Sequence, residues 1–208
     1  MSLSTNTLAE LAPVTLHGKT VRLEPLTIDH VPALWKAGSD PELWHWIPNQ
    51  IKTIDDMRAY VVSALEDQQR GTALPFVIVD QGTDQVIGST RYAAIVPAHR
   101  RLEIGWTWLT PAHQRTTANT EAKCLLLAHA FEVLRAIRVE FKTDVLNEKS
   151  RNALLRIGAI PEGTFRKHFI CDSDRVRDTI YFSILDIEWP VVKQKLSKFL
   201  HSGPSENR

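Results

Sequence analysis

The sequence predicts an α+β (α/β) protein built around a mixed, mostly antiparallel sheet of about seven strands that is flanked by helices. Segments with strand periodicity and segments with helical periodicity follow one another in the order strand, two to three helices, three strands, helix, strand, helix, two strands, helix. A long helix separates the strand that ends at Leu109 from the strand that contains Phe141. A crossover of this kind joins parallel strands, so we expect these two to form a parallel pair in an otherwise antiparallel sheet.

The composition is that of an ordinary globular protein. Of the 208 residues, 43% are hydrophobic and 24% are charged. Basic and acidic residues nearly balance, at 25 and 24, so no general electrostatic reason favours nucleic acid or an anionic membrane as a partner. No apolar run approaches the roughly 20 residues that cross a bilayer, and the N-terminus lacks the pattern of a secretory signal. We therefore expect a cytoplasmic protein.

The cysteines and histidines show no metal-binding pattern. Cys124 and Cys171 form no CxxC pair, and the eight histidines have no HxxxH or HExxH spacing. We expect no metal site and two reduced thiols. Because no linker or repeat divides the chain, we expect one domain over residues 14–200, preceded by a flexible arm (1–13) and followed by a disordered tail (201–208).

The first part of the domain predicts a hairpin, helices and two strands. Residues 14–26 form a hairpin-like entry with Gly18 at its turn. Gly88, inside a later strand, indicates a bulge or a close approach of another backbone. The segments expected here are helices at 31–38, 41–46 and 53–70, the last with a capping-box pattern at Thr53 and Asp56, and strands at 74–79 and 86–95 joined by a turn at 80–84.

The stretch from Leu102 to Ala136 organises the rest of the chain. Residues 102–109 alternate as a strand, Pro111 ends it, and Thr120 is expected to cap a helix that runs to about residue 136. A strand, a loop and a helix N-terminus make an anion site, because unpaired backbone N–H groups converge there. The segments expected after it are a strand at 138–143, a helix closed by Gly158, strands at 164–171 and 176–184, and a helix at 187–200.

The loop within this stretch resembles that of a known family. The order strand, Gln114-Arg115-x-x-x-Asn119-Thr120-Glu121-Ala122, long helix resembles the acetyl-coenzyme A (acetyl-CoA) segment of the GNAT N-acetyltransferases, and its Thr-Glu-Ala resembles the Rim-type (RimJ/RimL-like) branch. The resemblance covers residues from about 14 to about 200. It implies a GNAT fold, in which the central parallel strands splay to admit the pantetheine arm of the cofactor and loop amides bind its pyrophosphate. The cofactor-binding residues that it implies in this segment are Leu109, Gln114, Arg115, Thr116, Thr117, Ala118, Asn119 and Thr120.

One departure from the family pattern concerns glycine. The family loop usually has Gly, one residue, then Gly or Ala, at the positions where this chain has Thr117 and Asn119. A loop without glycine lacks the residue that adopts unusual dihedral angles most easily and lets a phosphate approach the backbone most closely. Asn tolerates left-handed geometry next best, so Asn119 reduces the difference without removing it.

Two residues are candidates for the general base that takes a proton from an attacking amine. Glu103 resembles the Glu of a Glu-Ile pair on the same strand in several GNAT enzymes, and a carboxylate within an apolar strand is expected to have a raised pKa. The alternative for Glu103 is a structural ion pair with Arg101 or Arg91. His168 is the rival base, since its ordinary pKa near 6.5 suits the task, and a packing role in its strand is the alternative.

The pattern Asn147-x-x-Ser150 ahead of a helix resembles the Asn-x-x-Ser of the family. The resemblance implies that Asn147 hydrogen-bonds the pantetheine or an ordered water and that Ser150 protonates the departing thiolate. The alternative is ordinary helix capping, for which both residue types are preferred, and one residue can do both. A typical GNAT proton donor is a tyrosine further along this helix. No Tyr lies between Ser150 and Gly163, which favours Ser150.

The activity that the resemblance implies is transfer of an acetyl group from acetyl-CoA to a primary amine, either a protein N-terminus or a small amine, by direct attack in a ternary complex. Trp44, Trp46 and Trp106 are expected to contact substrates, with core packing as the alternative. The other hypotheses are a silent CoA-binding module, a transferase for a larger acyl group such as succinyl, and a scaffold that binds the ribosome or nucleic acid, which the near-neutral charge disfavours. The family also suggests a homodimer.

Overall fold

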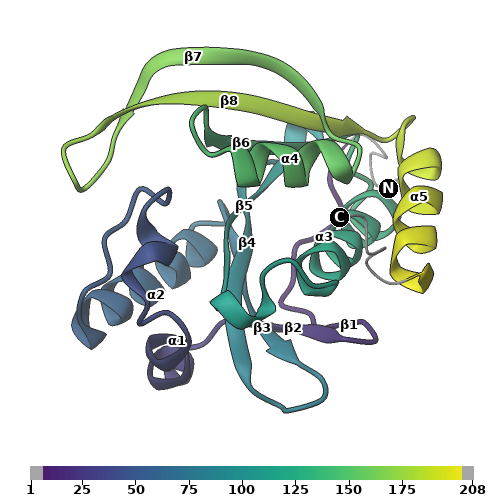
Figure 1. Ribbon diagram of the computed structural model, residues 1–208. Coiled ribbons are helices and arrows are strands. Elements are labelled where there is room, and N and C mark those ends of the chain that lie inside the picture. The colour runs from purple at the N-terminus through teal and green to yellow at the C-terminus, as the bar shows by residue number, and fades with distance from the viewer. Residues whose placement is uncertain (1–6, 203–208) are drawn as a thin grey trace.

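The computed structural model describes residues 7–202, which form one sheet with helices on both sides (Figure 1). The strands are β1 Leu16–His17, β2 Val21–Pro25, β3 Leu74–Asp80, β4 Val86–Val96, β5 Arg101–Leu109, β6 Arg138–Asp144, β7 Ile160–Ile170 and β8 Val176–Leu185. The helices are α1 Val31–Ala37, α2 Ile54–Gln69, α3 Ala118–Ala128, α4 Glu148–Arg156 and α5 Trp189–Ser202, and a π-helical segment, His129–Val133, continues α3. Short 3-10 turns lie at Ile28–His30, Pro41–Trp44, Pro97–His99 and Pro111–His113.

The strands lie in the order β1-β2-β3-β4-β5-β6-β8-β7. All neighbours are antiparallel except β5 and β6, which form the parallel pair predicted from the helix between them. This parallel pairing covers only Arg101–Glu103 against Arg138–Glu140, at the start of each strand. Beyond these residues the two facing backbone edges have no strand partner, and the sheet opens there. The splay that the resemblance implied is therefore confirmed.

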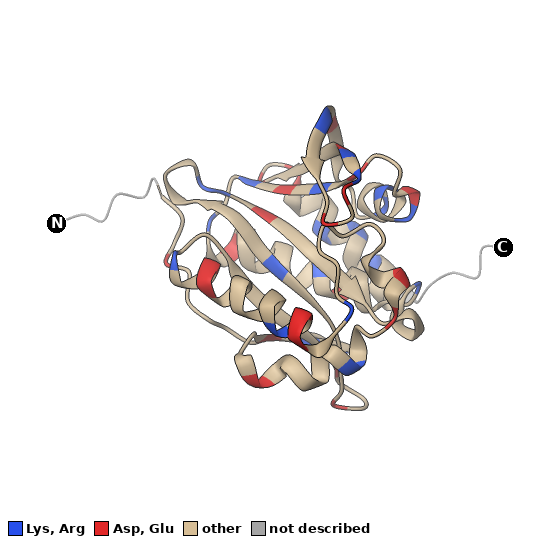
Figure 2. Cartoon of the chain, turned by 90° about the vertical axis from the view of Figure 1, so that its left-hand side faces the viewer, with Lys and Arg blue, Asp and Glu red and all other residues tan. Residues whose placement is uncertain are grey.

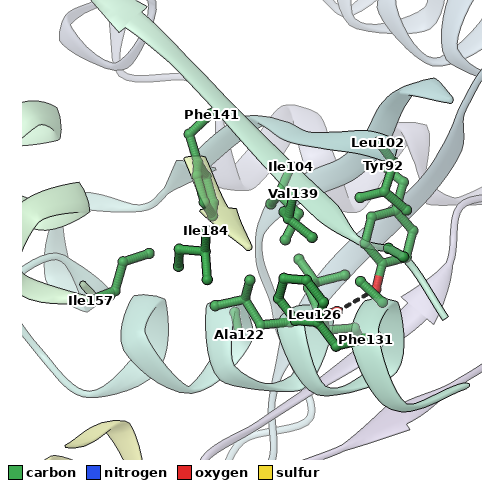
Figure 3. Packing of buried hydrophobic residues seen from close by; sticks show 14 of the residues in the cluster. Tyr92, Leu102, Ile104, Ala122, Leu126, Phe131, Val139, Phe141, Ile157 and Ile184 are labelled. Atoms are coloured by element: carbon green, nitrogen blue, oxygen red, sulfur yellow. Dashed lines mark hydrogen bonds between the residues drawn. The ribbon is translucent and has the colours of Figure 1, made fainter. Parts of the chain in front are cut away.

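Two hydrophobic clusters hold the helices against the sheet. On one face, α3 and α5 cover a cluster that includes Tyr92, Leu126 and Phe141 (Figure 3). The Tyr92 hydroxyl, fully buried there, donates a hydrogen bond of 2.6 Å to the carbonyl oxygen of Leu126. On the other face, α1 and α2 cover a second cluster around Trp44 and Trp108. Full burial of each large apolar side chain contributes about 1.5–3 kcal/mol, so both faces anchor the strands that form the site.

Gly88 meets the backbone of the next strand, as its place in a strand indicated. A Cβ atom on Gly88 would lie 2.1 Å from the carbonyl oxygen of Trp108 on β5, so no other residue fits there without moving a strand. The pairing of β3 with β4 also shifts between Ile78 and Val79, beside Gly88. The expected bulge and the expected close approach are therefore both present.

Four expectations need correction. The sheet has eight strands because the short hairpin at residues 14–26 supplies both β1 and β2. Thr117 rather than Thr120 is the N-cap of α3. β7 begins at Ile160 rather than Thr164, because an edge strand tolerates the missing N–H of Pro161 and a register shift absorbs Glu162.

The fourth correction concerns the ends of the chain. The expected arm over residues 1–13 is wrong at Leu8, which is 5% exposed and whose N–H donates to the carbonyl of Pro97. The N–H of Ala9 likewise donates to Leu134. At the other end, α5 continues to Ser202, into the segment expected to be a tail. Residues 1–6 and 203–208 lie outside the described part of the chain.

Basic and acidic residues are interspersed on the face that Figure 2 presents, in keeping with the near balance of charge. Among the helices of residues 7–202, none combines the length and the apolar character that a membrane span requires. Nor do the described residues include a group of three or more His, Cys, Asp or Glu side chains that could hold a metal ion.

Candidate active site

A cleft of about 1210 Å³ opens where β5 and β6 part. Its walls come from α2, β4, β5, the loop that leads into α3, the start of α4, and the β7–β8 hairpin that arches over α4 (Figure 1). The cleft brings together most of the residues that the sequence singled out. They are Trp46, Glu103, Trp106, Leu109, Gln114, Arg115, Thr116, Asn119, Asn147, Ser150 and His168.

A bulge in β5 shapes the middle of the cleft. Gly105 pairs with Arg91 and Trp108 pairs with Ser89, so Trp106 and Thr107 together oppose the single residue Thr90. Trp106 has a positive φ of 50°, which is costly for a residue with a large side chain. A bulge bends its strand and leaves backbone groups outside the ladder. The bulge therefore removes Trp106 and Thr107 from the regular ladder, and both residues line the cleft.

Glu103 lies at the point where β5 and β6 separate. Its side chain is only 6% exposed, and its Oε2 lies 2.7 Å from Nζ of Lys142 on β6. Burial raises the pKa of the Glu103 carboxyl, and the charge of Lys142 offsets part of this effect. The ion pair expected with Arg101 or Arg91 is wrong, because Arg101 pairs with Glu140 and the partner of Glu103 is Lys142.

Gly105 makes room for this carboxylate. A Cβ atom on Gly105 would lie 2.8 Å from Oε1 of Glu103, so the carboxylate occupies the space that a side chain at position 105 would take. Alternation along a strand puts residues 103 and 105 on the same face of β5, the face that α1 and α2 cover. The carboxylate is thereby held over Gly105.

Lys123 is a site residue that the sequence analysis missed. It lies on α3, it lines the cleft, and its Nζ donates a hydrogen bond of 2.6 Å to Oγ1 of Thr107 in the bulge. Nζ also lies 5.9 Å from the centre of the Phe141 ring. Burial lowers the pKa of Lys123 to about 7. The sequence contains a sign of this role: Lys123 precedes Leu126, Leu127 and Ala130 by three, four and seven residues, so it lies within the apolar face of the helix.

The loop before α3 takes its shape without glycine. Gln114 Nε2 donates to the carbonyl of Leu109, and Thr116 Oγ1 donates to the carbonyl of His113. Thr117, at a position where the family usually has glycine, has ordinary right-handed angles (φ −71°, ψ −17°). The left-handed residue of this loop is Arg115, with φ 61°. The dihedral angles therefore require no glycine at residue 117.

Three of the predicted cofactor-binding residues are not in the cleft wall. Ala118 and Thr120 are almost fully buried beneath the loop, and Thr117 also lies outside the wall. Asn119, in the first turn of α3, does line the cleft. The first backbone N–H groups of a helix have no acceptor inside it, so the N-terminus of α3 keeps the character of an anion site.

Asn147 and Ser150 lie where α4 begins. Oδ1 of Asn147 accepts a hydrogen bond of 3.0 Å from the backbone N–H of Ser150, which confirms the capping interpretation. Both residues also line the cleft. Because the cap uses the backbone of Ser150, its hydroxyl remains available for another role.

His168 lies on β7 in an aromatic group and in the same cleft wall. Its ring centre is 5.2 Å from that of Phe165 and 5.8 Å from that of Tyr181. Its side chain is exposed, on a strand whose residues are all exposed. The packing role is thus present, and a role as base also stays geometrically open.

The three tryptophans separate into two groups. Trp46 and Trp106 line the cleft, as expected for substrate contacts. The prediction for Trp44 is wrong, since its side chain is 1% exposed and its Nε1 donates to the carbonyl of Gly38. Trp44 packs against Trp108 with ring centres 5.2 Å apart, in the core beneath α1 and α2.

The comparisons with known proteins agree with this geometry. The sequence profile described as "Acetyltransferase (GNAT) domain" matches residues 20–160. The chain is 27% identical over 157 residues to the Bacillus subtilis protein named "Uncharacterized N-acetyltransferase YnaD", covering 76% of this chain and 88% of that protein.

Solved structures share the fold as well. A GCN5-related N-acetyltransferase from Brucella melitensis is 31% identical, with a TM-score of 0.87 over 94% of this chain and 89% of that one. RimJ from Mycobacterium smegmatis, in complex with CoA-disulfide, has a TM-score of 0.78 at 21% identity, over 89% of this chain and 94% of that one. The chain therefore belongs to the GNAT acetyltransferase family and is an acyltransferase.

Proposed function

We propose that this enzyme transfers the acetyl group of acetyl-CoA to a primary amine by direct attack in a ternary complex. The observation that carries the proposal is one continuous cleft, which joins the N-terminus of α3 to the buried carboxylate of Glu103 across the opening between β5 and β6. Acetyl-CoA is a long molecule with phosphates at one end and the reacting thioester at the other. One cleft that holds both an anion site and a shielded base suits a ligand of this shape.

The residues of the cleft fit CoA part by part. The first turn of α3, with Asn119 in the wall, offers backbone N–H groups to the pyrophosphate, and Arg115 adds a positive charge at the same loop. The unpaired edges of β5 and β6 offer backbone groups to the amides of the pantetheine arm, as an added strand would use them. Asn147 stands on the α4 side of this path.

The reaction then needs a base and a proton donor. Glu103, directly or through a water, takes a proton from the acceptor ammonium, and the neutral amine attacks the thioester carbonyl. The C–N bond forms as the C–S bond breaks, and the electron pair leaves with sulfur. Ser150 hydrogen-bonds the departing thiolate and gives it a proton, and the proton that the acceptor nitrogen loses as the amide forms restores the Ser150 hydroxyl, directly or through water. Backbone N–H groups left outside the ladder by the bulge at Trp106 are candidate donors to the carbonyl oxygen as it gains charge.

One observation favours the silent CoA-binding module as a second candidate. Glu103 already forms an ion pair with Lys142. A structural ion pair explains a buried carboxylate at this position as well as a catalytic role does. Steady CoA release with an amine acceptor supports the enzyme. Binding of acetyl-CoA without release under any acceptor supports the silent module.

A thermal-shift titration with acetyl-CoA, succinyl-CoA and CoA tests the binding step. We expect a saturable rise in melting temperature with acetyl-CoA, which Asn119→Asp abolishes because it adds a negative charge beside the pyrophosphate. Asn152→Asp adds the same charge on an exposed position outside the cleft wall and should leave the rise intact. A larger rise with succinyl-CoA would favour the longer acyl group. No rise with any of them would overturn the proposal.

We also propose that the protein is a cytoplasmic homodimer. β7 is an edge strand of the sheet and carries exposed apolar side chains, including Phe165 and Ile170. Edge strands with such side chains are prone to pair with another chain. Sedimentation equilibrium should give twice the monomer mass for the native protein and the monomer mass for Ile170→Asp.

A further inference from the structure

Arg91 is a buried cation with too few partners. It projects from β4 into the cleft wall, and it is 4% exposed. Its guanidinium lies over two rings, 5.1 Å from the centre of Tyr60 and 5.0 Å from that of Trp106. The rings cover the faces of the guanidinium but do not accept hydrogen bonds at its edge, and Nε has no hydrogen-bond partner among the described residues.

The nearby carboxylate does not complete this site. Oδ2 of Asp67 lies 3.8 Å from Nη1 of Arg91, which is too long for a hydrogen bond. Oδ1 of Asp67 accepts instead from Arg70 at 2.7 Å. The hydroxyl of Tyr60, in the same cleft wall, is also buried without a hydrogen-bond partner. Asp67 therefore offsets part of the Arg91 charge but satisfies none of its donors, and buried donors are normally hydrogen-bonded, so Arg91 and Tyr60 present donors that an anionic acceptor would satisfy.

The position of Arg91 relates it to the proposed base. Arg91 pairs with Gly105 across β4 and β5, and the carboxylate of Glu103 lies over the same Gly105. Arg91 and Glu103 therefore flank one glycine on the face of the sheet that α2 covers. An acceptor whose amino group meets Glu103 places its neighbouring substituent beside Arg91.

We propose that Arg91 and the Tyr60 hydroxyl bind a carboxylate of the acceptor, so that the acceptor is an amino acid with a free carboxylate. The inference rests on the proposed N-acetyltransferase function and specifies its substrate class. A guanidinium edge matches a carboxylate with two parallel hydrogen bonds, and burial strengthens the pair. Polyamines would bring a second cation to Arg91, and an uncharged peptide N-terminus would leave Arg91 unpaired.

The test compares acids with their amides. Native protein with acetyl-CoA is offered a panel of α-, β- and γ-amino acids, each beside its carboxamide, and CoA release gives kcat and KM. We expect at least one acid to have a kcat/KM at least tenfold above that of its amide. Arg91→Gln should raise KM for that acid at least tenfold with a smaller change in kcat, and Arg91→Lys should recover part of the loss. Arg58→Gln, which removes an exposed arginine on α2 outside the cleft wall, should change neither constant.

A second measurement does not depend on turnover. In the presence of CoA, the N-acetylated acid should raise the melting temperature of the native protein more than its amide does, and Arg91→Gln should remove this difference. Equal use of acids and amides, or a preference for a polyamine or an uncharged peptide, would overturn the inference. Acetyl-CoA binding without turnover of any amino acid would overturn it too, whereas the absence of acetyl-CoA binding would overturn the proposed function itself.

Discussion

Nζ of Lys123 donates a 2.6 Å hydrogen bond to Oγ1 of Thr107, and this bond links helix α3 to the bulge of β5. Thr107 Oγ1 also lies 2.8 Å from Oγ1 of Thr90, so the bulge is tied to β4 by the same hydroxyl. No carboxylate forms a salt bridge with Lys123 in the described part of the chain, and the cost of burying its charge lowers its pKa to about 7.

The lowered pKa predicts a pH dependence of stability. The unfolded state keeps the ordinary lysine pKa of 10.5, so between about pH 7 and 10.5 the unfolded state binds more protons and stability rises with pH. Below about pH 7 both states are protonated, and the burial cost is fully present. Lys123→Met should therefore stabilise the protein more at pH 6 than at pH 9, by on the order of 3 kcal/mol, because the burial cost falls at about 1.4 kcal/mol per pH unit between about pH 7 and pH 9.

Urea unfolding of native protein and Lys123→Met at both pH values measures this difference. Lys195→Met, which removes an exposed lysine on α5, is the matched control and should show no such dependence. An equal effect of Lys123→Met at pH 6 and pH 9 would contradict a lowered pKa.

Glu103→Gln should lower kcat by about 10²–10⁴-fold with little change in acetyl-CoA binding, because it removes the proposed general base and keeps the shape of the side chain. Burial raises the pKa of Glu103, so native kcat/KM should fall on the acid side at a pH above the ordinary glutamate value of 4.5. Glu66→Gln is the control, since it makes the same change at an exposed glutamate of α2 that lies outside the cleft wall. If His168→Gln instead abolishes turnover while Glu103→Gln retains it, His168 is the base.

Arg115→Gly should separate the shape of the loop from its charge. Arg115 has a left-handed backbone that glycine adopts without strain, so the variant should be as stable as the native protein or up to about 1 kcal/mol more stable. It should also bind CoA more weakly, because a cation beside the proposed pyrophosphate site is lost. Melting curves without and with CoA give both numbers. Unchanged CoA affinity would show that the Arg115 side chain is only solvated.

Much of the fold could be predicted because its signals are local. Gly18 and Gly71 mark ends of elements, the Thr53–Asp56 capping box begins α2 as expected, and the crossover between Leu109 and Phe141 allowed few topologies. The cleft loop and the α4 cap were also found from motifs. Such patterns involve residues that are close in sequence, or the right-handed preference of crossover connections, so they can be recognised in the sequence alone.

The remainder depends on contacts that are distant in sequence. Trp44 is buried rather than in the cleft because of where α1 and α2 meet β5. The partner of Glu103 is Lys142 because β5 and β6 pair in one particular register, which alternation alone does not give. Arg91 is underpaired only because Asp67 lies just beyond hydrogen-bond distance. Strand register and the exact distances between side chains depend on the packing of the whole core, which no local pattern in the sequence specifies.

Glu121 shows how a family motif can have a structural meaning. Its Oε1 accepts from the backbone N–H of Lys19, and its Oε2 accepts from those of Thr20 and Val21, at 2.7–2.8 Å. These donors lie in the turn between β1 and β2 and at the start of β2, so Glu121 ties the first hairpin to α3, whose N-terminus is the proposed anion site. Gly18 fits the same contact, because a Cβ atom there would lie 2.6 Å from the Glu121 carboxyl carbon.

Glu121→Gln should therefore destabilise the fold, by on the order of 3 kcal/mol, because hydrogen bonds to a charged acceptor are lost and an amide N–H₂ can be turned toward backbone donors. Glu148→Gln is the control, since Glu148 lies in the first turn of α4 and is exposed, and loss of its favourable effect on a helix N-terminus costs only about 0.3–1 kcal/mol. Urea unfolding compares the two. Equal small losses would mean that Glu121 acts through the helix dipole alone, whereas a larger loss at Glu121 would identify its contacts with the turn as the reason a glutamate follows Thr120.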